Sequence, residues 1–90
     1  MAHRIEFSSR SRKALASLPR RDQARILVAI QALGQEPRPA GCKPVKAAPK
    51  GTYRIRVGDY RVIYTVLDDE LVVVVARVAR RDESTYEGMG

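Results

Sequence analysis

The chain has 90 residues, of which 44% are hydrophobic and 30% are charged. This length supports one small domain with a modest core, and the composition is too apolar for a disordered tail. No apolar run approaches the roughly 20 residues of a membrane-spanning helix, and no signal-peptide pattern follows Met1, so we expect a soluble, cytoplasmic protein. Seventeen Lys and Arg against ten Asp and Glu give a net charge of +7, which favours nucleic acid or an acidic protein as partner.

Residue types that build common catalytic centres are sparse. The single cysteine, Cys42, excludes an internal disulfide and a Cys-rich zinc site. The only histidine, His3, is expected in a disordered N-terminal extension. No nucleophile–base pair and no phosphate-binding Gly-rich loop is apparent. An enzyme with this sequence would therefore work through cations and tyrosines, and RNA cleavage by the ribose 2′-OH is a reaction of that kind.

The N-terminal part predicts a strand and two helices. Residues 4–7 alternate polar and apolar side chains, which is the period of a half-buried strand. The serines that follow can cap a short helix over residues 12–18, and Pro19 either ends it or begins the next helix. Residues 20–33 carry an apolar stripe at helical spacing, and Gly34 is a natural cap for their C-terminal end.

The second half predicts a basic loop and three strands. Residues 36–50 are rich in proline and lysine and form an irregular connection. Strands follow over 52–57, 60–67 and 71–78, and the almost wholly aliphatic last strand is expected to be covered on both sides. The fold class is therefore α+β, a single domain over residues 1–90. Two N-terminal helices pack on a small antiparallel sheet in the order β-α-α-β-β-β, with a short C-terminal helical tail.

Three arginines interrupt the first strand pair. Side chains alternate along a strand, so Arg54 and Arg56 share one face, and a two-residue turn at 58–59 places Arg56 opposite Arg61. Like charges directly opposite each other repel, so we interpret the three as a site for an anion; a solvated basic face without ligand is the alternative. Further groups expected to bind RNA beside them are Lys43, Lys46 and Lys50 of the loop, Arg80 and Arg81 at the end of the last strand, and the Tyr86 ring.

The segments YRIRVGDYRVIY (53–64) and VVVVARVARRD (72–82) resemble the RelE/ParE toxin superfamily of bacterial type II toxin–antitoxin systems, and most closely its RelE branch. The resemblance covers essentially the whole chain. It implies an endoribonuclease (an mRNA interferase) that cuts mRNA in the ribosomal A site without a metal or cofactor, and a cognate antitoxin as partner. It also implies roles for five residues: RNA contacts by Arg54 and Arg56, transition-state charge stabilisation by Arg61, leaving-group assistance by Arg81 and stacking by Tyr86.

One departure from the family pattern concerns the general base. The best-known members usually carry lysines where this chain has Arg54 and Arg56, and a guanidinium is a poor base because its pKa stays above about 12. The resemblance then leaves Lys46, Lys50, Tyr86 or a ribosomal group for that step.

Two other functions remain open on the same fold. One is a ParE-like toxin that inhibits DNA gyrase by protein contact, and the other is a module that only binds an acidic antitoxin. The site model itself makes a geometric prediction: it fails if Arg56 and Arg61 lie on opposite faces of the sheet.

Overall fold

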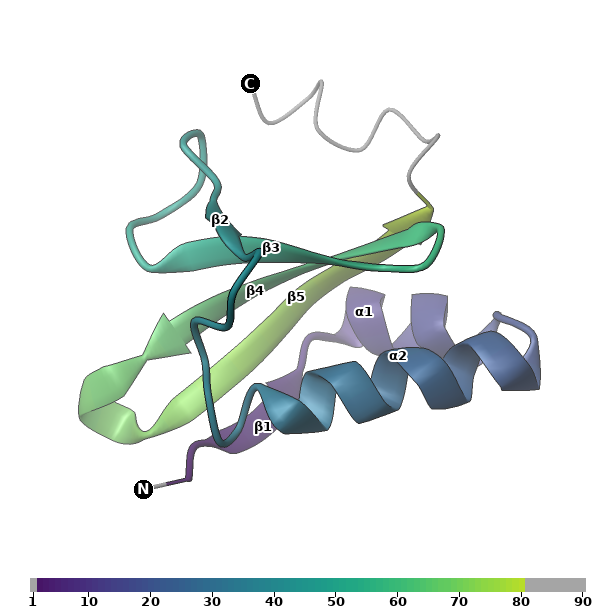
Figure 1. Ribbon diagram of the computed structural model, residues 1–90, viewed down its shortest axis with the longest axis horizontal. Coiled ribbons are helices and arrows are strands. Elements are labelled where there is room, and N and C mark those ends of the chain that lie inside the picture. The colour runs from purple at the N-terminus through teal and green to yellow at the C-terminus, as the bar shows by residue number, and fades with distance from the viewer. Residues whose placement is uncertain (1, 81–90) are drawn as a thin grey trace.

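Two α-helices and five strands follow one another in the computed structural model, which describes residues 2–80 (Figure 1). The order agrees with the predicted β-α-α-β-β-β plan, with one short additional strand in the basic loop. The predicted C-terminal tail lies outside the described residues. The elements are β1 (Arg4–Phe7), α1 (Ser9–Ala16), α2 (Arg20–Ala32), β2 (Lys43–Pro44), β3 (Thr52–Val57), β4 (Tyr60–Leu67), the 3-10 turn η1 (Asp68–Glu70) and β5 (Val72–Arg80).

Local capping explains where the two helices begin. The Ser8 hydroxyl accepts a hydrogen bond of 3.1 Å from the Ser11 amide, so α1 begins at Ser9, earlier than the predicted residue 12. Pro19 is the N-cap of α2, so it precedes the second helix rather than ending the first. Because α1 starts early, its Ser11 hydroxyl is buried and donates to a carbonyl of β5 at 2.8 Å.

The sheet has the strand order β1-β5-β4-β3-β2. Strands β3, β4 and β5 are antiparallel to their neighbours, as predicted. The short strand β2 pairs antiparallel with β3 through two residue pairs and forms the edge of the sheet. Strand β1 pairs with β5 in the parallel direction, so the sheet is mixed rather than antiparallel throughout. With β1 on one edge and β4 on the other, β5 lies inside the sheet, and its Val73 and Val75 point into the core.

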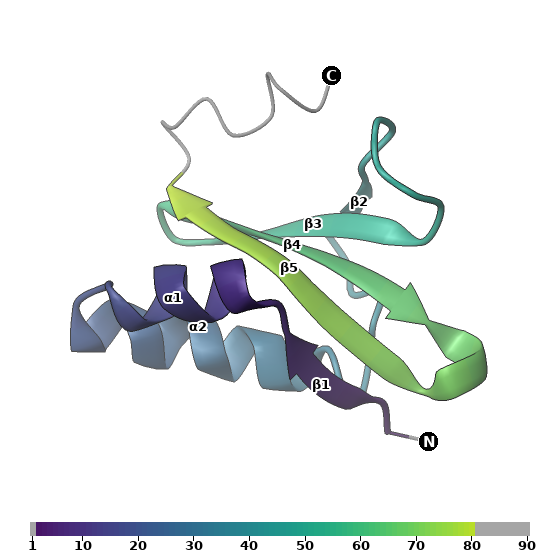
Figure 2. The ribbon, with the colours of Figure 1, turned by 180° about the vertical axis from the view of Figure 1, so that it is seen from behind.

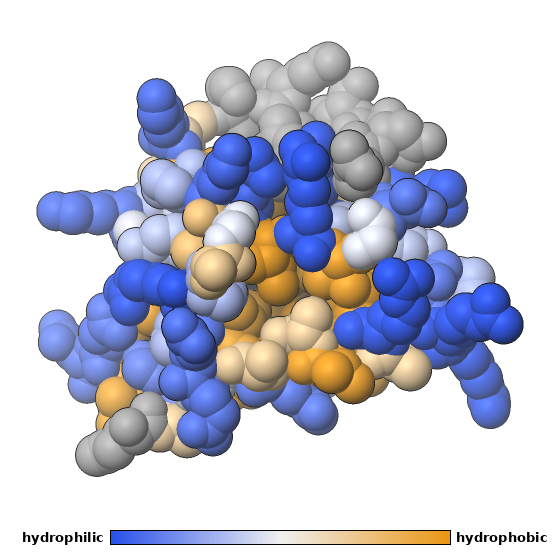
Figure 3. Space-filling model, in the orientation of Figure 1, coloured by the Kyte–Doolittle hydropathy of each residue, from blue (hydrophilic) through white to orange (hydrophobic). Residues whose placement is uncertain are grey.

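Both helices cover the same face of the sheet (Figures 1 and 2). Helix α1 packs against β5 and also contacts β1. The core lies between these two layers, and hydrophobic surface is visible between α2 and β3 in Figure 3. None of the helices in residues 2–80 is long and apolar enough to cross a membrane. The most deeply buried core side chains are Ile26, Ile30 and Leu33 from α2, Val62 and Tyr64 from β4, and Val73 and Val75 from β5.

Candidate nucleic-acid interface

A tight turn sets the register of the β3–β4 hairpin. Gly58 has a φ of 59°, which suits glycine, and Asp59 is not among the residues with positive φ. Positive φ at the first central residue alone is the pattern of a type II′ turn, whose twist matches that of the flanking strands. The ladder consequently pairs Val57 with Tyr60 and Arg56 with Arg61. Directly paired residues project from the same side of a sheet, so the shared-face prediction for Arg56 and Arg61 is confirmed.

A second row of paired residues extends this face across three strands. Arg54 pairs with Ile63, and Ile63 pairs on its other side with Arg77 of β5. Ile63 is buried between them although it points away from the helices. We call the cations on this side the arginine face; they are Lys43, Arg54, Arg56, Arg61 and Arg77.

Arg77 belongs to this face because β5 changes its alternation. Val73 and Val75 point into the core, and strict alternation would direct residue 77 there too. A register shift in the β4–β5 pairing lies between these positions, so the next core residue is Val78 and Arg77 turns outward. Arg77 was not among the predicted residues of the site. An arginine at a position that alternation assigns to the core is a signal that could have indicated the bulge.

The same shift moves Arg80 away from the arginine face. Arg80 pairs with Tyr60, and its guanidinium carbon lies 5.8 Å from the centre of the Tyr60 ring, on the side that faces the helices. The Tyr60 hydroxyl donates to the Asp22 carboxylate at 2.7 Å, and this hydrogen bond raises the pKa of Tyr60. Arg80 therefore projects from the end of β5 on the opposite side from the three hairpin arginines, and its contact with RNA stays a prediction. The other two C-terminal candidates, Arg81 and Tyr86, lie outside the described residues.

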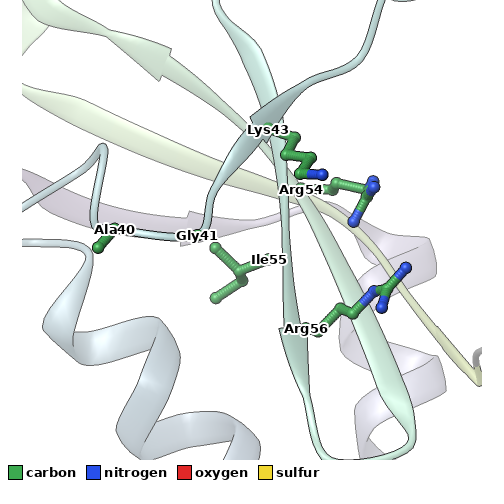
Figure 4. A pocket seen from close by; sticks show the side chains of 6 residues that line it. All are labelled: Ala40, Gly41, Lys43, Arg54, Ile55 and Arg56. Carbon is green, nitrogen blue, oxygen red and sulfur yellow. The ribbon is translucent and has the colours of Figure 1, made fainter.

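The loop between α2 and β3 adds a lysine to the arginine face. Lys43 of β2 pairs with Arg54, and Figure 4 shows its amine beside the Arg54 guanidinium, with Arg56 on the same side and Ile55 pointing away. These side chains line a shallow pocket. Lys46 and Lys50 are exposed in the turn that follows β2, so they border the face rather than form part of it.

A buried hydroxyl and an ionic network hold the start of this loop. The Tyr64 hydroxyl donates to the Pro37 carbonyl at 2.7 Å, and burial raises the pKa of Tyr64. Arg38 donates to the Asp68 carboxylate at 2.7 Å and to the Tyr53 hydroxyl at 3.1 Å. The loop is thereby anchored to both β4 and the β4–β5 turn before it reaches β2.

His3 completes the network at the β4–β5 turn. Its Nε2 lies 3.2 Å from the Asp68 carboxylate, and its amide donates to the Gly34 carbonyl at 2.7 Å. His3 is thus packed against the domain, and the predicted disordered extension is wrong at this residue. The Arg38 guanidinium, and to a lesser extent His3, hold the pKa of Asp68 below its ordinary value.

The chemistry of the arginine face is that of an anion site. Guanidinium groups donate paired hydrogen bonds to phosphate oxygens and keep their charge at any physiological pH, so they can bind a phosphodiester and stabilise negative charge that develops on it. The same permanent charge prevents them from accepting a proton. Within residues 2–80, no three His, Cys, Asp or Glu side chains gather closely enough to hold a metal ion.

Comparison with known proteins gives consistent matches along the chain. The family model described as "ParE toxin of type II toxin–antitoxin system, parDE" matches residues 5–85. Toxin RelG of Mycobacterium tuberculosis is 34% identical over 82 residues, which cover 90% of this chain and 93% of RelG. The archaeal RelE–RelB complex from Pyrococcus horikoshii is 30% identical with a TM-score of 0.76, covering 93% of this chain and all of the matched chain. Isolated RelE of E. coli shares the fold with a TM-score of 0.79 at 22% identity, over 97% of this chain and 93% of that one.

Proposed function

This chain belongs to the ParE toxin family of type II toxin–antitoxin systems, with RelE toxins among its relatives, and on that premise we propose that it is a ribosome-dependent mRNA endonuclease. Membership of the family confirms the resemblance drawn from residues 53–64 and 72–82. The observation that supports the nuclease is the direct pairing of Arg56 with Arg61 on the helix-free face, with Arg54 and Arg77 in the adjacent row.

Strand geometry fixes the spacing of the backbone positions from which these arginines extend. Arg54 and Arg56 are two residues apart on one strand, so their Cα atoms are about 6.8 Å apart. Arg61 lies on the neighbouring strand, with its Cα atom about 5 Å from that of Arg56. Long, flexible side chains at such distances can converge on one phosphodiester or contact two consecutive ones. A phosphate bound on this side of the sheet would meet both guanidinium groups, because the ladder pairs Arg56 directly with Arg61.

In the proposed reaction the ribose 2′-oxygen attacks the adjacent phosphorus. A bond forms between that oxygen and phosphorus while the bond from phosphorus to the 5′-oxygen breaks, which leaves a 2′,3′-cyclic phosphate and a free 5′-OH. Arg56 and Arg61 would bind the non-bridging oxygens, where negative charge grows in the transition state. By family resemblance, Arg81 would assist the departing 5′-oxygen and Tyr86 would stack on a base. The RNA supplies its own nucleophile, so the enzyme contributes positioning, charge and proton transfer.

The proton of the 2′-OH needs an acceptor that is not a guanidinium. Lys43 lies beside Arg54 on the arginine face, and an amine can lose its proton and act as a base where an arginine cannot. We assign this step to Lys43 in preference to Lys46 and Lys50, because Lys43 pairs with Arg54 on the face, whereas the other two follow β2 in the turn at its border.

A cognate antitoxin is the expected protein partner, and the cytoplasm is the expected location. The Pyrococcus horikoshii relative was solved as a complex of RelE with RelB, and other matched structures are likewise toxin–antitoxin complexes. An acidic antitoxin would also find a strongly basic surface here, since the chain carries a net charge of +7.

Inhibition of DNA gyrase is the second candidate, favoured by the ParE description of the family model that matches residues 5–85. The two activities can occur on one fold, so the fold does not decide between them. They make different demands on the arginine face. A nuclease needs Arg56 and Arg61 to contact the scissile phosphate, whereas an inhibitor that acts by protein contact needs them only if its partner presents an acidic surface.

Primer extension on a translated mRNA with purified ribosomes tests the nuclease directly. We expect cuts within A-site codons that are absent on naked RNA and lost in Arg61→Ala. Arg4→Ala is the matched control, because Arg4 is an exposed arginine on β1, paired with Glu6 at 2.8 Å and remote from the hairpin. A folded wild-type protein that produces no cuts would refute the proposal. A gyrase supercoiling assay, followed by antitoxin binding, would then separate the two remaining functions.

A further inference from the structure

Arg77 belongs to the arginine face, but the proposed reaction assigns it no step. Its side chain is half-buried, and no carboxylate of residues 2–80 forms an ion pair with it. By contrast, Arg4 and Arg38, elsewhere on the surface, pair with carboxylates at 2.8 and 2.7 Å. A partly buried guanidinium without an acidic neighbour carries a charge that no acid compensates, so an anionic ligand would stabilise it.

A β-bulge brings Arg77 to the helix-free side of the sheet. The ladder pairs Ile63 with Arg77 and Tyr64 with Val75, so Ala76 is the extra residue on β5. Without that insertion, the side chain at position 77 would point into the core as that of Val75 does. Bulges are frequent beside functional sites because they re-aim a side chain. This one adds a cation from a third strand to those of the hairpin.

Arg77 is a diagonal neighbour of Arg61. Arg61 pairs with Ala79 of β5, and Arg77 is two residues before Ala79 on the same strand. Diagonal neighbours across a strand pair have Cα atoms about 7–8 Å apart, which long side chains can bridge. The methyl group of Ala79 is too short to separate the longer side chains of Arg61 and Arg77. On its other side Arg61 pairs with Arg56, so these three arginines extend from three adjacent strands.

The aliphatic stem of Arg77 also has a structural neighbour. Ile63 is 2% exposed, and it pairs with Arg54 on one side and with Arg77 on the other. The stems of both arginines can cover Ile63 whatever their guanidinium groups bind. Arg77→Met separates the two roles, because it keeps an unbranched stem over Ile63 and removes the charge.

We propose that Arg77 binds a phosphate that adjoins the scissile phosphate, so that the RNA backbone crosses from the hairpin to β5. This inference rests on the proposed function, in which Arg56 and Arg61 bind the oxygens of the scissile phosphate. Arg77 extends from the strand beyond Arg61, and its guanidinium can donate paired hydrogen bonds to phosphate oxygens. Such a contact reads no base, but it fixes which linkage lies between Arg56 and Arg61. Arg77 accordingly positions the substrate and touches no reacting atom.

The test compares Arg77→Met with Arg4→Met, which each remove one positive charge, in a ribosome titration of the cleavage rate. Arg77→Met should raise the half-saturating concentration of programmed ribosomes several-fold and leave the saturating rate within about two-fold of the wild type. Its melting temperature should not fall, because the stem still covers Ile63. Arg4→Met should change neither kinetic constant. Arg77→Lys should restore most of the lost affinity, because a phosphate contact accepts either cation.

Neutral linkages in the mRNA identify the phosphate that Arg77 contacts. In two messages, a methylphosphonate replaces one or the other of the phosphates that adjoin the scissile one. One of these messages should raise the half-saturating concentration for the wild type and have no further effect on Arg77→Met, as a double-mutant cycle gives for a direct contact. If neither neutral linkage distinguishes the wild type from Arg77→Met, the proposal is overturned.

Binding of a short single-stranded RNA, measured by anisotropy without ribosomes, separates this inference from the proposed reaction. If the wild type cuts no mRNA but Arg77→Met lowers the slope of log affinity against log salt by about 1, the nuclease fails and the phosphate contact stands. A wild type that cuts mRNA, beside an Arg77→Met variant with unchanged kinetic constants, would overturn the inference alone. A lower melting temperature together with a lower saturating rate would also overturn it, since Arg77 would then only cover Ile63. Equal RNA binding by two proteins that do not cut would end both proposals.

Discussion

A single methyl group at Gly58 tests the geometry that pairs the two central arginines. Gly58 adopts a φ of 59°, and an L-residue in this left-handed region loses about 1–2 kcal/mol relative to glycine. The new Cβ would also meet the Arg25 guanidinium at 2.9 Å, but that group is the end of a flexible side chain and can move. The backbone term should therefore dominate. For a domain of this size, Gly58→Ala should lower the melting temperature by about 5–15 °C.

The assay is thermal unfolding of the wild type, Gly58→Ala, Arg25→Ala and the double variant. If backbone strain dominates, Gly58→Ala should have the same effect in both backgrounds, to within about 0.5 kcal/mol. The folded variant should still cleave mRNA at low temperature, because six residue pairs of the β3–β4 ladder hold Arg56 opposite Arg61 without help from the turn. An unchanged melting temperature would refute the assigned turn. A loss that vanishes in the Arg25→Ala background would show that the contact with Arg25, not the positive φ, requires glycine.

Substitutions at three further positions test the groups in and around the basic loop. Lys43→Arg and Lys43→Ala should each reduce the saturating cleavage rate by about 10²-fold or more if Lys43 accepts the proton, and retention of the rate in Lys43→Arg would reduce its role to charge. Tyr64→Phe should destabilise the domain by about 1 kcal/mol in a denaturant titration, since the hydroxyl that donates to Pro37 is lost. Asp68→Asn should lower the melting temperature at neutral pH. Because Arg38 depresses the pKa of Asp68 in the folded state, the difference from wild type should persist above the unfolded pKa of about 3.9 and disappear as pH falls through the lower folded value.

Elements with strong local signals were predictable from the sequence. Residues 52–57 and 60–67 alternate around a two-residue turn, so the strands, their register and the shared face of Arg56 and Arg61 all follow from short-range rules. The helical stripe of residues 20–33 predicted α2 almost to its ends. The predicted function depended on the family resemblance, because an arginine-rich hairpin alone is also compatible with a solvated surface.

Groups that depend on pairing between distant segments were missed or misplaced. His3 looked like part of a free terminus, yet Asp68, far away in sequence, holds it against the β4–β5 turn. One bulge in the β4–β5 ladder shifts every later side chain of β5 to the other face. Arg77 therefore lies on the outer face and Arg80 on the helix side, the reverse of what strict alternation predicts. No composition or spacing rule reports such a bulge, although an arginine in the core register is a local conflict that points to one.

The same distinction applies to the chemistry of the proposed site. The phosphate-binding arginines come mainly from one hairpin, so strand alternation alone brings them together. The proposed proton acceptor, Lys43, reaches them from a separate loop whose position depends on the hydrogen bond from Tyr64 to Pro37 and the contact of Arg38 with Asp68. Substitutions in these anchors should therefore lower the saturating cleavage rate more than RNA affinity, because they displace the base while the hairpin cations stay in place. Equal losses in rate and affinity would instead mean that the loop contributes to binding alone.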